Sequence, residues 1–285
     1  MISKKQFDTI IKNNLEKQSG TITFGYGEKE LYYSPADFNK FVKEMQEAKY
    51  ERFFIRYDKG NGNELKAKGT MPPKMASVAS SSRFCYLALR DGGDALGGTG
   101  DVEVEHGCKI EGVKGTAPQL DAYIENENIF VEVKCHEIFD RHRMTMKSAY
   151  HDLLFGDNND FGLDMKVSIN SKNEFEIPAS VFGANKNTMF DLKQFICHLL
   201  GIDSNTKGKK AKLVYLFFKP LCKDEEESKQ IEVVFEKLKG EIKSVFESTP
   251  VNNFILKNNI TLSAVAEYSE CMDALTKDNM IVLYP

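Results

Sequence analysis

Residues 115–139 read GTAPQLDAYIENENIFVEVKCHEIF, in which apolar and polar side chains alternate on either side of the polar segment ENEN. Such alternation around a short polar turn predicts two antiparallel strands joined as a hairpin. An even-length turn at the centre of ENEN pairs Asp121 with Glu132 and Gln119 with Lys134. Because side chains two residues apart in a strand share a face, all four are expected to point the same way.

The opposite face of this hairpin is wholly apolar and is expected to pack on a core. A slip of one residue in the pairing would bury the charges and expose the apolar side chains, so the register should be well specified. The apolar face is formed by Leu120, Ala122, Ile124, Ile129, Val131 and Val133.

Two carboxylates and a lysine therefore converge on one side of the predicted sheet. Two adjacent acids repel each other, and Lys134 alone does not neutralise both Asp121 and Glu132 at close range. A hard divalent cation such as Mg²⁺ would do so, because it prefers oxygen ligands and is commonly held by one or two carboxylates, water and a substrate phosphate. The alternative is a cross-strand salt-bridge ladder on a solvated face.

This segment resembles the PD-(D/E)XK nuclease superfamily, through Asp121 followed after ten residues by Glu132, Val133 and Lys134. The literal Pro-Asp pair is absent, since the chain reads PQLD at residues 118–121. The wider runs APQLD, EVKCHE and KQFICH are similar to an uncharacterised bacterial restriction-endonuclease-like branch. The resemblance spans roughly residues 75–220.

The resemblance implies a site built on four residues. Asp121 and Glu132 would be metal ligands, with the backbone carbonyl of Val133 as a further ligand. Lys134 would position the attacking water, which makes Asp121, Glu132 and Lys134 the catalytic candidates. The implied cofactor is Mg²⁺, with Mn²⁺ able to substitute.

Three further candidates complete this interpretation. The superfamily usually has another acid upstream, for which Glu105 is our choice and Glu103 the reserve. Both are candidates because they share a face of the predicted strand 102–110, and the sequence does not separate them. Gln194 lies where some relatives have a helix glutamine that contacts the substrate backbone. Gln119, on the carboxylate face of the hairpin, is the second candidate for substrate contact.

The predicted fold is α/β, with a restriction-endonuclease-like core in the order α-β-β-β-α-β and a mixed central sheet flanked by helices. We divide the chain into an N-terminal α/β addition (1–73), the nuclease-like core (74–220), and a C-terminal helix and strands packing on that core (221–285). The expected elements are helices at 4–18, 34–48, 75–90, 188–200 and 224–247, and strands at 21–24, 30–33, 52–57, 102–110, 118–124, 129–135, 212–218, 260–266 and 280–284. Gly201 is the expected stop of the helix at 188–200.

Composition sets the remaining limits. The 285 residues are 41% hydrophobic and carry a formal net charge of −4, which argues against a protein that coats nucleic acid but not against an enzyme that holds it in a groove. No secretory or membrane-spanning stretch is present in the sequence, so a cytoplasmic location is expected. The six cysteines form no CxxC pair, and we expect free, mostly buried thiols.

Two other patterns have weaker interpretations. His106, Cys108, Cys135 and His136 lack the spacing of a structural zinc site. The lysines in residues 207–212 form the densest basic cluster, for which nucleic-acid contact and an ordinary solvated loop both remain open.

The predicted function is Mg²⁺-dependent hydrolysis of phosphodiester bonds, as expected of a DNA endonuclease. The alternative is a non-catalytic nucleic-acid-binding protein on the same fold. The expected partner is nucleic acid, with DNA preferred over RNA and no membrane, and a homodimer would suit cleavage of both strands of a duplex.

Overall fold

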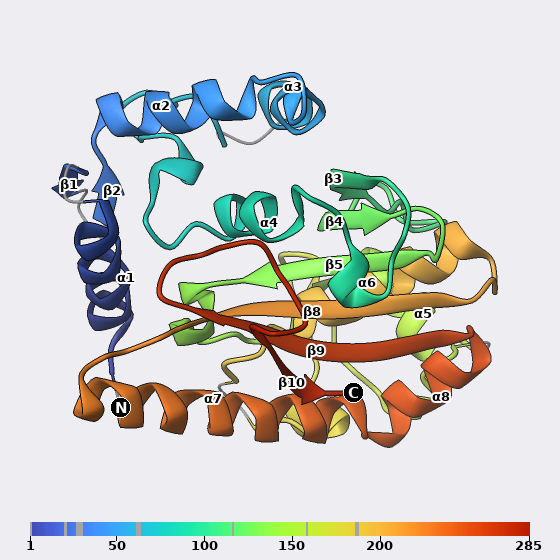
Figure 1. Cartoon of the computed structure of the whole chain (residues 1–285). Coiled ribbons are helices and arrows are strands. Elements are labelled where there is room, and N and C mark those ends of the chain that lie inside the picture. Colours follow the sequence, from blue (N-terminus) through green and yellow to red (C-terminus); the bar gives the residue numbers. More distant parts are fainter. Residues whose placement is uncertain are drawn as a thin grey trace.

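A computed structural model of the chain describes residues 2–19, 22–26, 31–60, 64–115, 117–157, 159–185 and 188–285. Its centre is a six-stranded mixed sheet in the order β10-β9-β8-β5-β4-β3 (Figure 1). β5 pairs with β8 and β8 pairs with β9 in parallel. The remaining pairings, β10 with β9, β5 with β4 and β4 with β3, are antiparallel. The strands are β3 (Val102–Gly107), β4 (Gln119–Ile124), β5 (Ile129–Lys134), β8 (Ala211–Pro220), β9 (Ile260–Ser269) and β10 (Met280–Tyr284).

Helices cover both faces of this sheet, because alternate residues of the central strand β8 pack on different helices. Phe218 contacts Phe84 of α4 (Ser81–Leu89) on one face, with ring centroids 5.4 Å apart. Tyr215 contacts Phe195 of α6 (Leu192–Thr206) and Phe246 of α7 (Glu225–Phe246) on the other. Figure 1 shows α4 above the strands, and α7 with α8 (Thr249–Lys257) below them. The predicted mixed α/β architecture with a helix-flanked central sheet is confirmed.

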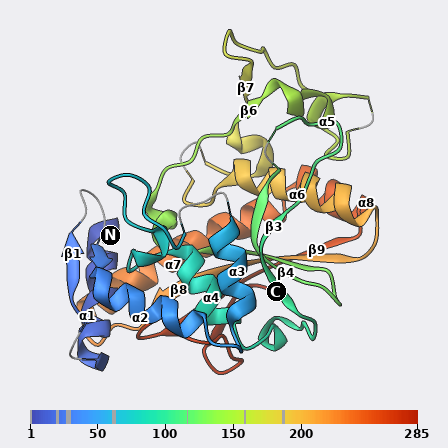
Figure 2. The ribbon, with the colours of Figure 1, turned by 90° about the horizontal axis from the view of Figure 1, so that it is seen from above.

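The central part of the chain has the predicted succession of elements, as α4, β3, β4, β5, α6 and β8. Between β5 and α6 it carries an additional segment that contains β6 (Thr145–Lys147), α5 (His151–Phe155) and β7 (Glu174–Glu176) and lies to one side of the sheet in Figure 2. The C-terminal strands β9 and β10 extend the same sheet. The short 3-10 helices are η1 (Lys74–Ala76), η2 (Asp94–Leu96), η3 (His136–Phe139), η4 (Ser148–Tyr150) and η5 (Ala179–Phe182).

The N-terminal segment contains α1 (Lys4–Ser19), the hairpin of β1 (Phe24–Tyr26) and β2 (Leu31–Tyr33), α2 (Pro35–Met45) and α3 (Glu51–Lys59). The first residues of the strands predicted at 21–24 and 30–33 lie outside the described residues. No helix in the described part of the chain is both long and apolar enough to cross a membrane.

The strand predicted at 52–57 is wrong, because these residues belong to α3. Phe53 and Tyr57 are the buried pair, and they are four residues apart, as on one face of a helix. Phe53 packs edge-on against Tyr86 of α4, with ring centroids 5.6 Å apart. A short run rich in aromatic residues has strand propensity, but the core here accepts only every fourth side chain.

Two predicted helix limits also need correction. The helix expected at 75–90 is the 3-10 turn η1 followed by α4, whose first turn is capped by Ser80 accepting from the N–H of Arg83. Gly201 does not end its helix, since α6 continues to Thr206. A Cβ at Gly201 would lie 2.8 Å from Cβ of Cys108, so the glycine permits close approach of α6 to the chain after β3.

Gly201→Val is therefore expected to destabilise the protein by about 1–3 kcal/mol, because backbone and Cβ of Cys108 leave no room for a side chain. Gly240→Ala is the matched control, since Gly240 lies within α7 with nothing near its absent Cβ. That change should stabilise by up to about 1 kcal/mol through helix propensity. Urea unfolding measures both, and equal effects of the two substitutions would contradict the packing argument.

Candidate active site

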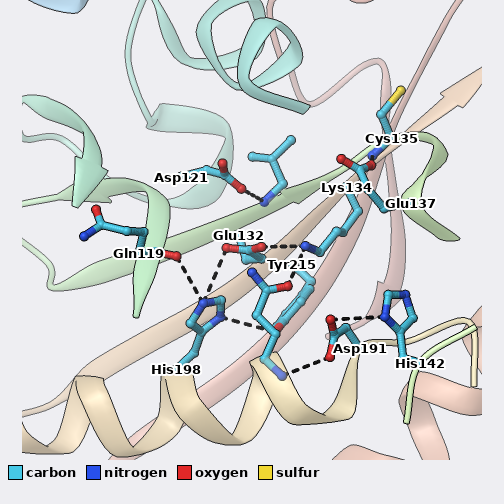
Figure 3. A network of polar contacts seen from close by, with 12 residues as sticks. Gln119, Asp121, Glu132, Lys134, Cys135, Glu137, His142, Asp191, His198 and Tyr215 are labelled. Atoms are coloured by element: carbon cyan, nitrogen blue, oxygen red, sulfur yellow. Dashed lines mark hydrogen bonds and ion pairs between the residues drawn. The ribbon is translucent and has the colours of Figure 1, made fainter. Parts of the chain in front are cut away.

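The hairpin has the predicted register. Ala122 pairs with Val131, and Ile124 with Ile129, which are the pairings expected from a turn at the centre of ENEN. Beyond Ala122 the side chain of Asp121 replaces the backbone ladder, because its Oδ2 accepts the N–H of Val133 at 2.7 Å (Figure 3). The carboxylate of Asp121 thus lies beside β5 instead of standing directly across from Glu132.

Glu132 and Lys134 form a buried pair next to Asp121. Lys134 Nζ donates to Oε1 of Glu132 at 2.6 Å and to Oε1 of Gln194 at 2.7 Å. The side chains of Glu132 and Lys134 are 3% and 15% exposed. Oε2 of Glu132 is buried without a hydrogen-bond partner among the described residues.

Burial sets the charge state of these groups. It raises the pKa of Asp121 well above its usual range, with a further contribution from the charge of Glu132. Burial also raises the pKa of Glu132, although Lys134 opposes this. For Lys134 burial favours the neutral amine, but the charges of Glu132, Glu137 and Asp121 outweigh it and the pKa is raised. Lys134 is therefore an ammonium group at neutral pH.

α6 supplies a second layer of polar contacts beneath this pair. His198 Nε2 lies 3.2 Å from the carbonyl oxygen of Gln119 and 3.7 Å from Oε2 of Glu132, while Nδ1 lies 3.5 Å from the hydroxyl of Tyr215. Burial lowers the pKa of His198 to about 3, so the imidazole is neutral. The tautomer that satisfies these contacts carries its proton on Nε2 and accepts from Tyr215 at Nδ1.

The first turn of α6 places Gln194 at the site. Asp191 caps the helix by accepting the N–H of Gln194 at 3.0 Å, and its other oxygen lies 3.2 Å from Nδ1 of His142. Burial alone would raise the pKa of Asp191, but the contacts with His142 and Gln194 hold it below its usual value. Gln194 and His198 are four residues apart, which puts both on the face of α6 that meets β5.

A cavity of about 1030 Å³ brings these groups together. It lies between the α4 side and the α6 side of the chain, at the C-terminal end of β5. It is lined by several residues of the N-terminal segment and by six predicted site residues, but not by Val133 or Glu103. The six are Glu105, Gln119, Asp121, Glu132, Lys134 and Gln194. The charged and amide lining residues are Arg56, Lys59, Glu64, Lys74, Glu105, Gln119, Asp121, Glu132, Lys134, Glu137 and Gln194.

The structure separates the two candidates for the upstream acid. Glu105 lines the cavity and has a positive φ of 54°, which breaks the alternation of β3. Burial, followed by the charges of Asp121 and Glu64, raises the pKa of Glu105 to about 7. Glu103 is instead ion-paired to Arg56 and contacts Nδ1 of His106 at 3.2 Å. Glu105 is therefore the upstream acid that lies with Asp121 in the cavity, whereas Glu103 is not among the residues that line it.

The other residues considered in the sequence, His106, the cysteines and the basic loop, do not belong to the group of side chains that lines the cavity. Cys108 and Cys135 are buried free thiols, and His106 stacks on Tyr123. Within the described residues, no group of three or more His, Cys, Asp or Glu side chains is arranged to hold a metal ion. The basic loop at 207–212 lies at the opposite end of β5 from Lys134, since Lys212 pairs with Ile129.

The residues that sequence reasoning missed come from two places. His198 and Asp191 flank Gln194 on α6, and their four-residue and three-residue offsets from it were the available signal. Glu64 and Lys74 come from the segment between α3 and α4, where no local pattern points to the site. Comparison of the chain with protein-family models, with curated protein sequences and with solved structures finds no match.

Proposed function

We propose that this chain is a metal-dependent nuclease that hydrolyses phosphodiester bonds, with DNA as the expected substrate. The observation that carries the proposal is the meeting of Asp121, Glu132 and Lys134 in one cavity. There the buried carboxylate of Glu132 lies beside a partly buried carboxylate and a partly buried ammonium group. A salt-bridge ladder on a solvated face would expose these side chains. Buried acids that are not fully paired are costly to the fold, and such groups concentrate at functional sites.

The residues present fit a divalent cation. The unpartnered Oε2 of Glu132 is a desolvated oxygen that a cation would satisfy. Asp121 provides a second carboxylate, and the carbonyl of Val133 faces the side of β5 to which its N–H points, toward Asp121. With two side-chain ligands, water and substrate oxygens would complete the shell, which is the way Mg²⁺ is usually held. Such an ion supplies a Lewis acid for a phosphoryl oxygen and lowers the pKa of water.

The chain's own side chains account for positioning. Hydrolysis joins a water oxygen to phosphorus while the ester P–O bond breaks, and the leaving oxygen takes up a proton. Lys134, as an ammonium group, can orient the water and stabilise charge on the phosphate, but it cannot accept the proton. Gln194 accepts from Lys134 through Oε1, which leaves its amide nitrogen to donate to the substrate backbone. Gln119 lines the same cavity as a further substrate contact.

The test is cleavage of supercoiled plasmid and of single-stranded DNA by the parent protein with Mg²⁺, Mn²⁺ or EDTA. Cleavage is expected with either metal and not with EDTA. The melting temperature should also rise with metal, since a ligand at 100 times its Kd adds about 2.7 kcal/mol to the free energy of unfolding. A metal shift and DNA binding without cleavage would instead identify a non-catalytic binding protein. If metal does not change the melting temperature and no DNA is cleaved, the interpretation that remains is a salt-bridge ladder without a catalytic role.

A further inference from the structure

The cavity is also lined by one member of a buried ion pair that the proposed mechanism does not use. His136 lies two residues beyond Lys134, at the start of η3, and lines the cavity. Its Nδ1 lies 2.8 Å from Oδ1 of Asp8, which belongs to α1. The side chains of His136 and Asp8 are only 7% and 5% exposed. Taking a charged pair out of water costs free energy, and such groups concentrate at functional sites.

The first turns of α1 hold this pair in place at the end of β5. Phe7 packs against Phe139, with ring centroids 5.1 Å apart, and Lys4 Nζ lies 3.2 Å from Oδ2 of Asp140. These two α1 residues and the aspartate of the pair are spaced three and four residues from Lys4, so they share one face of the helix. That face contacts both ends of η3, which restrains the orientation of His136.

The surroundings of His136 favour its charged form. Burial alone would lower the pKa of His136, but the hydrogen bond and charge of Asp8, with a contribution from Glu137, outweigh burial and raise this pKa. Lys4 opposes the shift. The charged groups that act on the imidazole are thus Asp8 and Lys4 of α1 and Glu137 of η3. The imidazolium form therefore persists to a higher pH than that of an ordinary histidine.

The acid that pairs with His136 lies on the far side of the imidazole from the cavity. Lys134 pairs with Glu132, and that acid lines the cavity itself. Lys74 pairs with Glu64, which also lines it. The partner of His136 comes from α1 and is not among the lining residues. The positive end of this pair therefore faces the cavity and the negative end faces away from it, which suits an anion.

We propose that His136 donates a hydrogen bond from Nε2 to the substrate phosphate next to the scissile one, and that Asp8 is the positioning residue that fixes the imidazole for this contact. Two residues of chain span at most about 7 Å, so adjacent phosphates of one strand can contact Lys134 and His136. The inference rests on the proposed nuclease function and deepens it with a substrate contact. Hydrogen bonds from an imidazolium to phosphate are short and strong.

The contact makes DNA binding dependent on pH. A positive charge whose pKa is raised is present at lower pH and is lost as the pH rises through that value, so affinity should fall toward alkaline pH. Fluorescence anisotropy of a labelled single-stranded oligonucleotide measures the affinity of the full chain between about pH 5 and 9. EDTA is present so that no cleavage is expected. Glu105, with a pKa of about 7, gains negative charge in the same range, so the contribution of His136 is the difference between the parent and His136→Gln.

His136→Gln should weaken binding at acid pH by about tenfold, the scale of a hydrogen bond to a charged group. At alkaline pH the variant and the parent should bind nearly alike. The slope of log affinity against log salt concentration should also fall by about 0.7 at acid pH, as for the loss of one phosphate contact with a single strand.

Two further substitutions change the charge of the pair without removing the donor. Asp8→Asn keeps an oxygen that accepts the N–H of His136 but removes the negative charge, so the loss of affinity should move to lower pH. His136→Lys remains charged throughout the range, so it should keep the affinity of the parent at acid pH. Its remaining pH dependence should equal that of His136→Gln.

His151→Gln is the matched control, because His151 also pairs with an aspartate, Asp152, at 3.1 Å but lies outside the cavity lining. It should bind like the parent at every pH. Thermal melting shows whether each variant is folded. If His136→Gln does not fold because the charge of Asp8 is left unpaired, the double variant Asp8→Asn, His136→Gln removes that charge and should show the same loss of affinity.

The outcomes separate this inference from the proposed function. If the pair only fastens α1 to η3, the substitutions alter the melting temperature but neither the pH dependence nor the salt slope, which overturns the inference and leaves the nuclease proposal standing. Failure of His136→Lys to keep the affinity would assign the loss to packing and also overturn the contact. A parent that binds no oligonucleotide overturns it too, since the contact needs no metal ion, and plasmid cleavage then tests the nuclease function separately. Binding that depends on the charge of His136, without cleavage, supports the contact and refutes only the nuclease function.

Discussion

Asp121→Asn is expected to abolish metal-dependent cleavage while raising the melting temperature of the metal-free protein. The carboxylate of Asp121 is partly buried beside the buried Glu132, and desolvation and the charge of Glu132 both raise its pKa, so its negative charge is unfavourable to the fold when no cation is bound. Asparagine keeps an oxygen that can accept the N–H of Val133. The rate of cleavage should fall by at least about 10³-fold, the scale of losing one group that stabilises transition-state charge. A gain of about 1 kcal/mol would raise the melting temperature by roughly 2 °C.

Plasmid cleavage and thermal melting in EDTA measure the two effects in one preparation. Asp101→Asn is the control, because Asp101 is an exposed acid that pairs with Arg52 outside the cavity, and it should change neither quantity. Cleavage by Asp121→Asn at the parent rate would mean that the activity belongs to a contaminant or to another site. A lower melting temperature in this variant would show that the carboxylate stabilises the fold and would favour the alternative that these residues form a salt-bridge ladder.

Lys134→Met is expected to remove cleavage and to destabilise the protein by about 3–5 kcal/mol, the usual consequence of removing one partner of a buried ion pair. Methionine fills similar space but leaves the Glu132 carboxylate buried without its donor, and Gln194 without its hydrogen bond. Urea unfolding in EDTA measures the loss.

The double variant Glu132→Gln, Lys134→Met is the matched comparison, because it removes the stranded charge as well as the lysine. It should recover most of the lost stability and remain inactive. If the single variant were as stable as the parent, Glu132 would already be neutral or solvated, and the account of a charged buried pair would be wrong. If the double variant recovered activity, neither residue would belong to the catalytic site.

The sequence by itself determined the parts of this protein that depend on neighbouring residues. The alternation around ENEN determined the hairpin register, because strand periodicity and turn length admit only one pairing that buries Leu120 and Val131 together. The helix starts predicted at 34 and 224 are close to the observed starts of α2 and α7, where Ser34 and Asp224 each accept an N–H of the first turn. These patterns depend on residues close together in the sequence, so they do not require a particular tertiary structure.

Only the tertiary structure decided how the site is enclosed. In residues 52–57, six residues were too few to distinguish strand from helix, and packing on Tyr86 selected the helical spacing of Phe53 and Tyr57. Gly201 lies inside α6 because a neighbouring segment approaches it, which no pattern around the glycine reveals. Glu64 reaches the carboxylate cavity from far along the chain. Convergence of distant residues is set by burial of the whole sheet and its helices, so local periodicity carries no record of it.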